Sequence, residues 1–213
     1  MRIENQTIGS YVEDVISSKP VPGGGSVSAL AGSQGAALIA MVIALTVNKK
    51  YFADFAPEDQ EQMKALAEYF AAKKDRLLEL SGEDIAAYDG FMVALRLPKD
   101  TEEEKRARKE AMQKAQIHAM DIPLYFARLA AQALERVPLV ARLGNVNAIS
   151  DAAVGTLCLE VAVRGGVYNA RINLPGIEDQ ALVNQVAVEC KSLIEKTEAL
   201  VKEILQIVEE RLG

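Results

Sequence analysis

The sequence is poor in the residues that build metal and redox sites. It has one histidine, two cysteines and no tryptophan among 213 residues. Structural and catalytic zinc sites take most of their ligands from Cys and His side chains, so one of the usual composition is hard to assemble here. Cys158 and Cys190 stand alone in apolar segments without CxxC spacing, which favours buried structural thiols. We therefore expect no metal and no organic cofactor.

An excess of positive charge is also missing. The formal net charge is -6 at pH 7, and no cluster of Lys and Arg offsets it. Such a chain repels a phosphate backbone, so nucleic acid is not an expected partner. The polar start, Met1 to Gln6, lacks the apolar stretch of a signal peptide, and we expect a cytoplasmic protein.

The longest uncharged stretch lies between Lys19 and Lys49. Its length raises the possibility of a membrane span. Ser28, Ser33 and Gln34 interrupt it, and its many Ala and Gly residues give little transfer free energy. With no second segment of this kind expected, the stretch is interpreted as a core helix and not as a membrane span.

Hydrophobic periodicity predicts helices along the whole chain. Gly82 and Pro123 are each expected to break or kink a helix, Ser26 is the expected N-cap of the second helix, and the apolar run 154–163 is also a candidate for a buried strand. The expected helices cover residues 7–19, 27–47, 57–81, 84–97, 101–122, 150–172 and 179–212. These segments predict one all-α domain over residues 1–213, an up-and-down bundle of long helices with small-residue helices at its centre.

The loop Gly23-Gly24-Gly25, followed by Ser26, is the first candidate for a functional feature. Glycines let the backbone approach a ligand closely, and the first N–H groups of a helix are free donors at its positive end. A simple turn between two helices explains the same residues. Neither the dinucleotide fingerprint nor a P-loop is present, because no strand precedes the loop and no GK[ST] follows it.

Two carboxylates are the candidates for chemistry. Asp84 shares a helix face with Tyr88, Phe91 and Leu95, which turns it towards the apolar side of the helix, raises its pKa and suits proton transfer. An acid in the first turn of a helix, stabilising that helix, is the alternative. Asp151 follows Ser150 at an expected helix start. An ordinary helix N-terminus explains the presence of these two residues equally well.

Taken in order, several motifs resemble the cyclodeaminase domain of formiminotransferase-cyclodeaminase and its stand-alone bacterial relatives, which include methenyltetrahydrofolate cyclohydrolases. The motifs are Pro22-Gly23-Gly24-Gly25-Ser26, Asn48-Lys49-Lys50-Tyr51-Phe52, Asp84, Leu97-Pro98-Lys99, Gly144-Asn145, Ser150-Asp151, Tyr168-Asn169 and Ile172-Asn173-Leu174-Pro175. The resemblance implies a multihelical homodimer with tetrahydrofolate substrates and a cleft near the subunit contact. Because the chain starts close to its first helix, we expect no formiminotransferase activity.

The expected reaction is cyclodeamination of 5-formimidoyltetrahydrofolate to 5,10-methenyltetrahydrofolate and ammonia. Methenyltetrahydrofolate cyclohydrolase and a non-enzymatic folate-binding protein are the alternatives. Asp84 is the first choice for proton transfer and Asp151 the second carboxylate. The expected folate contacts are Gly23, Gly24, Gly25, Ser26, Asn145, Ser150 and Asn169, with Lys49 or Lys50 on the glutamate tail, whether or not it is polyglutamylated.

Overall fold

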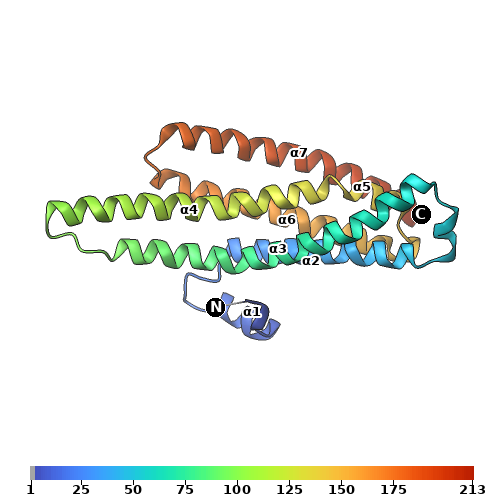
Figure 1. The fold of residues 1–213 in the computed structure, drawn as a ribbon, viewed down its shortest axis with the longest axis horizontal. Helices are drawn as coiled ribbons and strands as arrows, with labels where there is room; N and C mark the ends of the chain where they lie inside the picture. The colour runs from blue at the N-terminus through green and yellow to red at the C-terminus, as the bar shows by residue number, and fades with distance from the viewer. Residues whose placement is uncertain (1–2) are drawn as a thin grey trace.

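The computed structural model describes residues 3–213, with all of these side chains except that of Glu4. Met1 and Arg2, part of the polar start used above to argue against a targeting peptide, lie outside the described residues. Long helices dominate residues 3–213, which contain no strand, so the all-α prediction is confirmed (Figure 1). The α-helices are α1 (Ile8–Ile16), α2 (Gly24–Val47), α3 (Pro57–Leu95), α4 (Glu102–Leu134), α5 (Val137–Leu143), α6 (Ile149–Asn173) and α7 (Gln180–Leu212).

Two local predictions about helix boundaries, at Ser26 and at Gly82, are wrong. Helix α2 begins at Gly24, with Gly23 and not Ser26 as its N-cap. Helix α3 runs through Gly82, because an interior glycine costs only about 1 kcal/mol while the continuous helix keeps Leu77, Leu80 and Ala87 in the core. The run 154–163 belongs to α6, so the strand alternative is excluded.

Helix α4 continues through Pro123, where a break or kink was expected. A proline at that position removes the N–H that would bond to the Ala119 carbonyl one turn earlier. The side-chain amide of Asn173, on α6, donates to that carbonyl at 3.0 Å instead. A contact between distant segments therefore satisfies the group that the proline leaves free.

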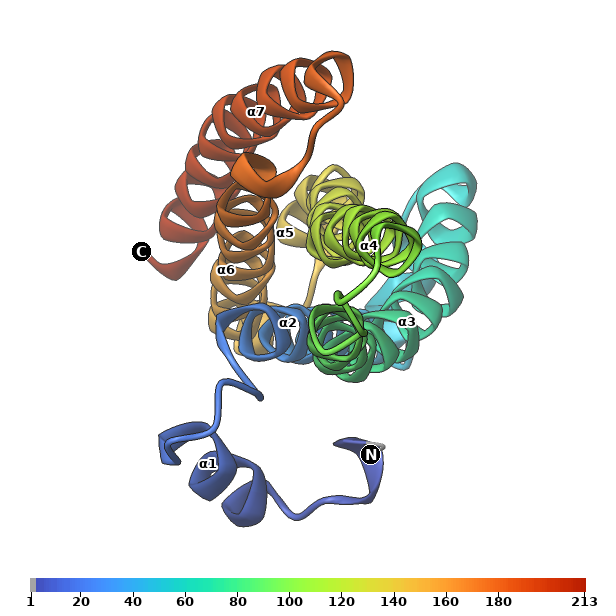
Figure 2. The same ribbon diagram turned by 90° about the vertical axis from the view of Figure 1, so that its left-hand side faces the viewer.

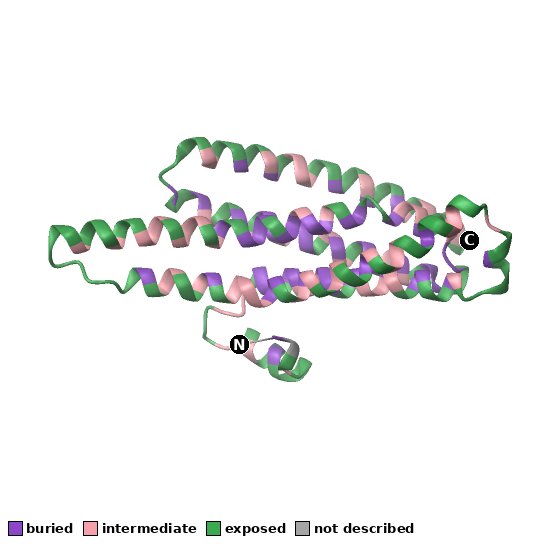
Figure 3. Ribbon diagram, in the orientation of Figure 1, coloured by how far each residue is buried: buried purple, intermediate pink, exposed green. Residues whose placement is uncertain are grey.

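Helices α2 and α6 form an antiparallel pair along one side of the bundle, with α3 packed against α2 and α4 packed against α6 (Figure 2). Their backbones approach closely at glycines, because a Cβ on Gly32 would lie 2.7 Å from that of Ala162 and one on Gly35 would lie 2.7 Å from the Gly155 carbonyl oxygen. Only small residues allow this spacing. The buried positions face inwards along the bundle (Figure 3).

Two helices are long and apolar enough to cross a membrane by length and composition: α2, and the stretch Val146–Gly176 that contains α6. The expectation of no second such segment is therefore wrong. In the 18-residue apolar window of each stretch, 44% of the residues are buried inside the bundle. Each helix thus has one side packed in the core and one side turned outwards.

Helix α1 lies apart from the bundle in both ribbon views (Figures 1 and 2). It ends at Ile16, earlier than the expected boundary near Pro20. Tyr11 is its buried residue, whereas Ile8 and Ile16 are about four-fifths exposed, at 80% and 79%. The helix is therefore attached to the rest of the chain chiefly through one aromatic side chain.

Candidate active site

The first turn of α2 meets the carboxylate of Asp84, which comes from the C-terminal third of α3. Gly23 gives this helix start no side-chain cap. A Cβ built on Gly25 would lie 2.3 Å from Asp84 Oδ1, so the carboxylate rests directly on the glycine backbone. The side chain of Asp84 occupies the anion-binding position at this helix start, and only glycine at position 25 leaves room for it.

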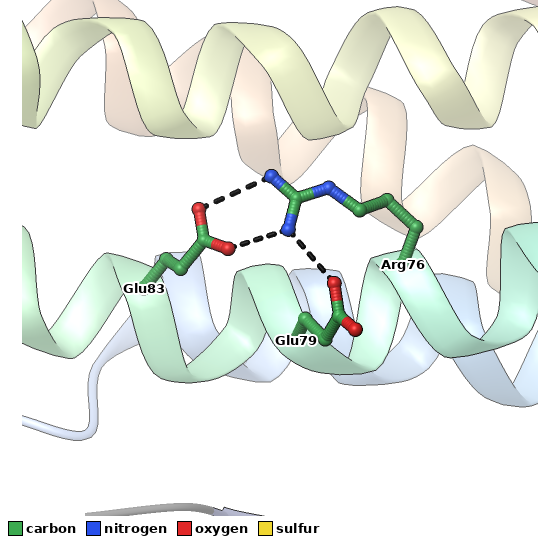
Figure 4. A network of polar contacts seen from close by, with 3 residues as sticks. All are labelled: Arg76, Glu79 and Glu83. Carbon is green, nitrogen blue, oxygen red and sulfur yellow. Dashed lines mark hydrogen bonds and ion pairs between the residues drawn. The ribbon is translucent and has the colours of Figure 1, made fainter.

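Asp84 has a pKa raised to about 6, mainly because burial penalises its charged form, while the Ser26 backbone N–H acts in the opposite direction. The preceding residue, Glu83, is instead paired with a cation. Glu83 forms an ion pair with Arg76, which also binds Glu79 (Figure 4). Within residues 3–213 no cation lies within 4.0 Å of the Asp84 carboxylate. A desolvated carboxyl without a cation titrates near neutrality and can both accept and donate a proton.

A buried chain of hydroxyl groups fixes the first turn of α2 against α3. Ser81 Oγ donates to the Ser26 carbonyl at 2.8 Å and lies 2.9 Å from Ser26 Oγ. Tyr11 Oη lies 2.9 Å from Ser26 Oγ on its other side. Each hydroxyl has one proton, so Ser26 must donate to Ser81, and Tyr11 must donate to Ser26. The Ser26 hydroxyl is fully buried and engaged, and it therefore positions the site instead of contacting a substrate.

A cleft of about 250 Å³ opens beside Asp84, between α2, α3 and α6. Asn169 from α6 faces the helix start, since a Cβ on Gly24 would lie 3.5 Å from its amide nitrogen. The cleft is lined by Pro20, Val21, Gly23, Gly24, Gly25, Asp84, Tyr88, Ala119, Asn169, Ile172 and Asn173. The structure thus brings Asp84, the three glycines and Asn169 together, although they are far apart in the sequence.

The other predicted site residues lie at the opposite end of the α2–α6 pair. Lys49 follows the last turn of α2, about 37 Å from Gly24 at the rise of an α-helix. Ser150 and Asp151 lie in the first turn of α6, and Asp151 is about 27 Å from Asn169 by the same measure. Within one chain, Asp84 and Asp151 do not form the carboxylate pair that the sequence suggested.

Asn145 holds the loop before α6 in place. Its backbone N–H donates to Thr46 Oγ1 at 2.8 Å, its side-chain amide donates to the Leu45 carbonyl, and its side-chain oxygen accepts from the Asn147 N–H. The residue is 7% exposed. Its polar groups join the loop to the end of α2.

Ser81, Tyr11 and Asn173 are parts of this site that no sequence pattern predicted. Asn173 lies in the resembling motif, but its role depends on the Ala119 carbonyl, which no sequence pattern places beside it. His118 is exposed on α4 and takes no part in the cleft. Among residues 3–213 no group of three His, Cys, Asp or Glu side chains is placed to hold a metal ion.

Comparison with known proteins gives relatives over nearly the whole chain. Residues 7–192 match the family model described as formiminotransferase-cyclodeaminase. A methenyltetrahydrofolate cyclohydrolase of Methylorubrum extorquens is 34% identical over 209 residues, which are 98% of this chain and 99% of that protein. A formimidoyltransferase-cyclodeaminase of Sus scrofa is 32% identical over 202 residues, which are 95% of this chain but 37% of the pig protein.

The crystal structure of formiminotetrahydrofolate cyclodeaminase from Thermotoga maritima has the same fold. It superposes with a TM-score of 0.78 over 99% of this chain and 97% of that one, at 23% sequence identity. Similarity to two kinds of folate protein thus extends from the glycine-rich start of α2 to α7.

Proposed function

The chain belongs to the formiminotransferase-cyclodeaminase family of folate one-carbon enzymes, and we propose that it hydrolyses 5,10-methenyltetrahydrofolate at the cleft beside Asp84. The observation that carries the chemistry is a desolvated carboxyl with a pKa near 6, resting on the first turn of α2. The methenyl substrate is chosen because the Methylorubrum cyclohydrolase matches from end to end. No cofactor is needed, and we propose a cytoplasmic enzyme.

In this reaction Asp84 works first as a base and then as an acid. The ionised carboxylate takes a proton from water while the water oxygen bonds to the methenyl carbon. The protonated carboxyl then returns a proton to N5 as the bond between that carbon and N5 breaks. The hydroxyl on that carbon loses its proton as the C=O bond forms, so the one-carbon unit stays on N10 as a formyl group and one proton is released overall. The negative charge of Asp84 also attracts the cationic methenyl bridge into the cleft.

Cyclodeamination is the second candidate, and the multidomain formimidoyltransferase-cyclodeaminases favour it. There N10 attacks the formimidoyl carbon on N5, and ammonia leaves. The same carboxyl would take the N10 proton and pass it to the imino nitrogen, and a second proton taken up from solvent would let that nitrogen leave as ammonia. Both reactions pass through a tetrahedral carbon between N5 and N10, so one cleft can serve either.

The outward side of α2 and α6 supports a homodimer. Apolar residues follow one another along both helices on that side, among them Met41, Leu45, Val154, Leu157 and Val161, each at least 40% exposed. A contiguous apolar surface of this kind marks an interaction site. A two-fold axis that lies in the interface, perpendicular to the two helices and at their middle, would bring the Asp84 end of one copy to the Lys49 end of its partner. The residues separated within one chain would then meet across the interface.

Purified protein supplied separately with 5,10-methenyltetrahydrofolate and 5-formimidoyltetrahydrofolate tests the proposal. Absorbance of the methenyl chromophore and ammonia release are followed together. We expect the chromophore to disappear faster than in buffer with the first substrate. Its appearance together with ammonia from the second substrate would favour cyclodeamination instead. Folate binding without either reaction would contradict the proposal that the chain is an enzyme.

A further inference from the structure

A second pocket, of about 360 Å³, lies at the end of the bundle opposite Asp84. It is formed by the short 3-10 helix η2 (Lys50–Asp54), the loop before α6 and the end of α7. The pocket is lined by Tyr51, Phe55, Arg142, Leu143, Gly144, Asn145, Val146, Asn147 and Arg211. Its lining combines two aromatic rings, Tyr51 and Phe55, with two guanidinium groups, Arg142 and Arg211.

The aromatic side of the pocket is held rigidly. Phe52 is 5% exposed and anchors η2 in the core, with its ring packed against that of Phe55 at a centroid distance of 5.5 Å. Tyr51 is turned outwards, 41% exposed, and its ring centroid lies 5.9 Å from that of Phe55. Exposed rings at this spacing offer an edge and a face to another planar ring.

The pocket also carries positive charge. Arg211 donates to the carbonyls of Ala141 and Gly144, at 2.6 and 2.7 Å, and is thereby fixed in position. Arg142 is exposed, and no carboxylate within residues 3–213 lies within 4.0 Å of its guanidinium. A guanidinium free of acidic partners can bind a carboxylate through two parallel hydrogen bonds. Lys49 and Lys50 add two exposed cations to this end of the molecule.

We propose that this pocket binds the p-aminobenzoyl-glutamate part of the folate, with the benzoyl ring against Tyr51 and Phe55 and a glutamate carboxylate on Arg142. Additional glutamates would lie towards Lys49 and Lys50. The assignment rests on the proposed folate function and specifies where the substrate's acidic half is held. This part of folate has a planar ring, which suits the aromatic residues of the pocket, followed by carboxylates, which suit its guanidinium group.

The pocket serves the cleft of the partner copy. Within one chain it lies about 37 Å from the start of α2, which is longer than a monoglutamyl folate. In the dimer proposed above, the two ends of the α2–α6 pair lie next to each other across the two-fold axis. The pterin beside Asp84 of one copy and the glutamate on Arg142 of the other then belong to one substrate molecule.

Binding of p-aminobenzoyl-L-glutamate, measured by isothermal titration calorimetry on the intact protein, tests the pocket directly. Arg142→Gln should weaken binding about tenfold, the effect of losing one charge-assisted pair. Arg136→Gln is the matched control, because Arg136 is an exposed arginine of the same segment that lies outside this pocket. No binding to the unchanged protein, or equal losses in both variants, would overturn the assignment.

Turnover separates this inference from the proposed function. In Arg142→Gln we expect a KM for 5,10-methenyltetrahydrofolate about tenfold higher with kcat retained, because the lost contact holds substrate and transition state alike. Active protein with no response to Arg142→Gln would refute the tail pocket and leave the reaction intact. Binding of p-aminobenzoyl-L-glutamate without turnover would refute the reaction and leave the pocket intact.

Mixed dimers test whether the pocket belongs to the partner's cleft. Asp84→Asn and Arg142→Gln chains are unfolded, refolded together and assayed at substrate well below KM. If each site uses Asp84 of one copy and Arg142 of the other, a mixed dimer has one site with both residues unchanged. The mixture should then be several-fold more active than the mean of the two parents. Activity equal to that mean would contradict the placement across the interface.

Discussion

The two ends of the α2–α6 pair differ in how they hold charge. At one end a single carboxyl, Asp84, is desolvated on a glycine backbone, and no cation of the described residues 3–213 lies within 4.0 Å of it. At the other end Arg142, Lys49 and Lys50 are exposed, and two aromatic rings stand beside the arginine. A group that must exchange a proton near neutral pH benefits from burial, whereas a group that only holds an anion works best where it remains charged. We infer that the first end performs the chemistry and the second holds the substrate.

The largest effect should come from Gly25→Ala, which disturbs the position of the Asp84 carboxylate and leaves the opposite end of the α2–α6 pair unchanged. The added Cβ would lie 2.3 Å from Asp84 Oδ1, so the carboxylate must leave the first turn of α2. Displacement of a catalytic group by about 1 Å can cost about 100-fold in rate, and we expect a loss of that order in kcat. Gly90→Ala on α3 is the matched control, because nothing lies within 4 Å of its Cβ. A Gly25→Ala enzyme with a normal rate would contradict the proposed position of the catalytic carboxyl.

Dissociating the proposed dimer, which separates the Asp84 end of one copy from the Arg142 end of its partner, should have the next largest effect. Val161→Glu places a charge in the middle of the outward apolar face, where Val161 is 48% exposed. Burying an unpaired charge in an interface is strongly unfavourable, so light scattering should show monomers at micromolar protein. The value of kcat/KM should fall at least about tenfold, since one chain then carries only half of each site. Val188→Glu, on α7 and 71% exposed, should change neither quantity. A dimer that survives Val161→Glu would place the interface elsewhere.

The cost of burying Asp84 should appear as a gain in stability when its charge is removed. Its pKa is raised in the folded state, so the protonated form contributes stability at low pH that is lost as pH rises through about 6. Asp84→Asn should therefore stabilise the protein by about 1–3 kcal/mol near pH 8 and by less near pH 5. Urea unfolding at the two pH values measures this. Asp89→Asn, an exposed acid of the same helix, serves as control. Equal stability of the Asp84 variant and the parent near pH 8 would show that the charge is not desolvated.

The smallest effect is expected from Tyr11→Phe, which loosens the Asp84 end. The change leaves the Ser26 hydroxyl without its donor and should cost about 1 kcal/mol. Because Tyr11 is the buried residue of α1, amide exchange over residues 8–16 should become faster while exchange in α7 stays the same. A decrease of kcat by a few-fold should accompany it, as the first turn of α2 becomes less well positioned. Unchanged exchange in α1 would show that other contacts hold this helix.

Most helices of this fold can be predicted from hydrophobic periodicity. Whether a glycine or proline ends a helix cannot be predicted in the same way. Gly82 and Pro123 have the local signature of helix ends, and both lie inside long helices. Packing decides these cases. At Pro123 the carbonyl left free is satisfied by Asn173, which is 50 residues further along the chain. Local propensity has no information about such a partner.

The site was only half predictable for a similar reason. Asp84 was recognised from the helix face that it shares with Tyr88, and the glycines from their place before a helix. That the two features meet depends on the packing of α2 against α3. Asp151 and Lys49 carry equally plausible side chains, yet the antiparallel register of α2 and α6 places them at the far end. A register between helices arises from close contacts such as Gly35 with Gly155, which cannot be read from either helix alone.

The pH dependence of kcat for 5,10-methenyltetrahydrofolate hydrolysis, compared between the parent and Asp84→Asn, tests the role of Asp84 most directly. The parent should lose rate on the acid side with an apparent pKa of about 6, because the carboxylate must be ionised to accept a proton from water. The folded, dimeric Asn variant should retain less than about one-hundredth of the rate and show no such acid limb. A rate that does not change through pH 6, or an Asn variant with near-normal turnover, would show that Asp84 is not the group that moves the proton.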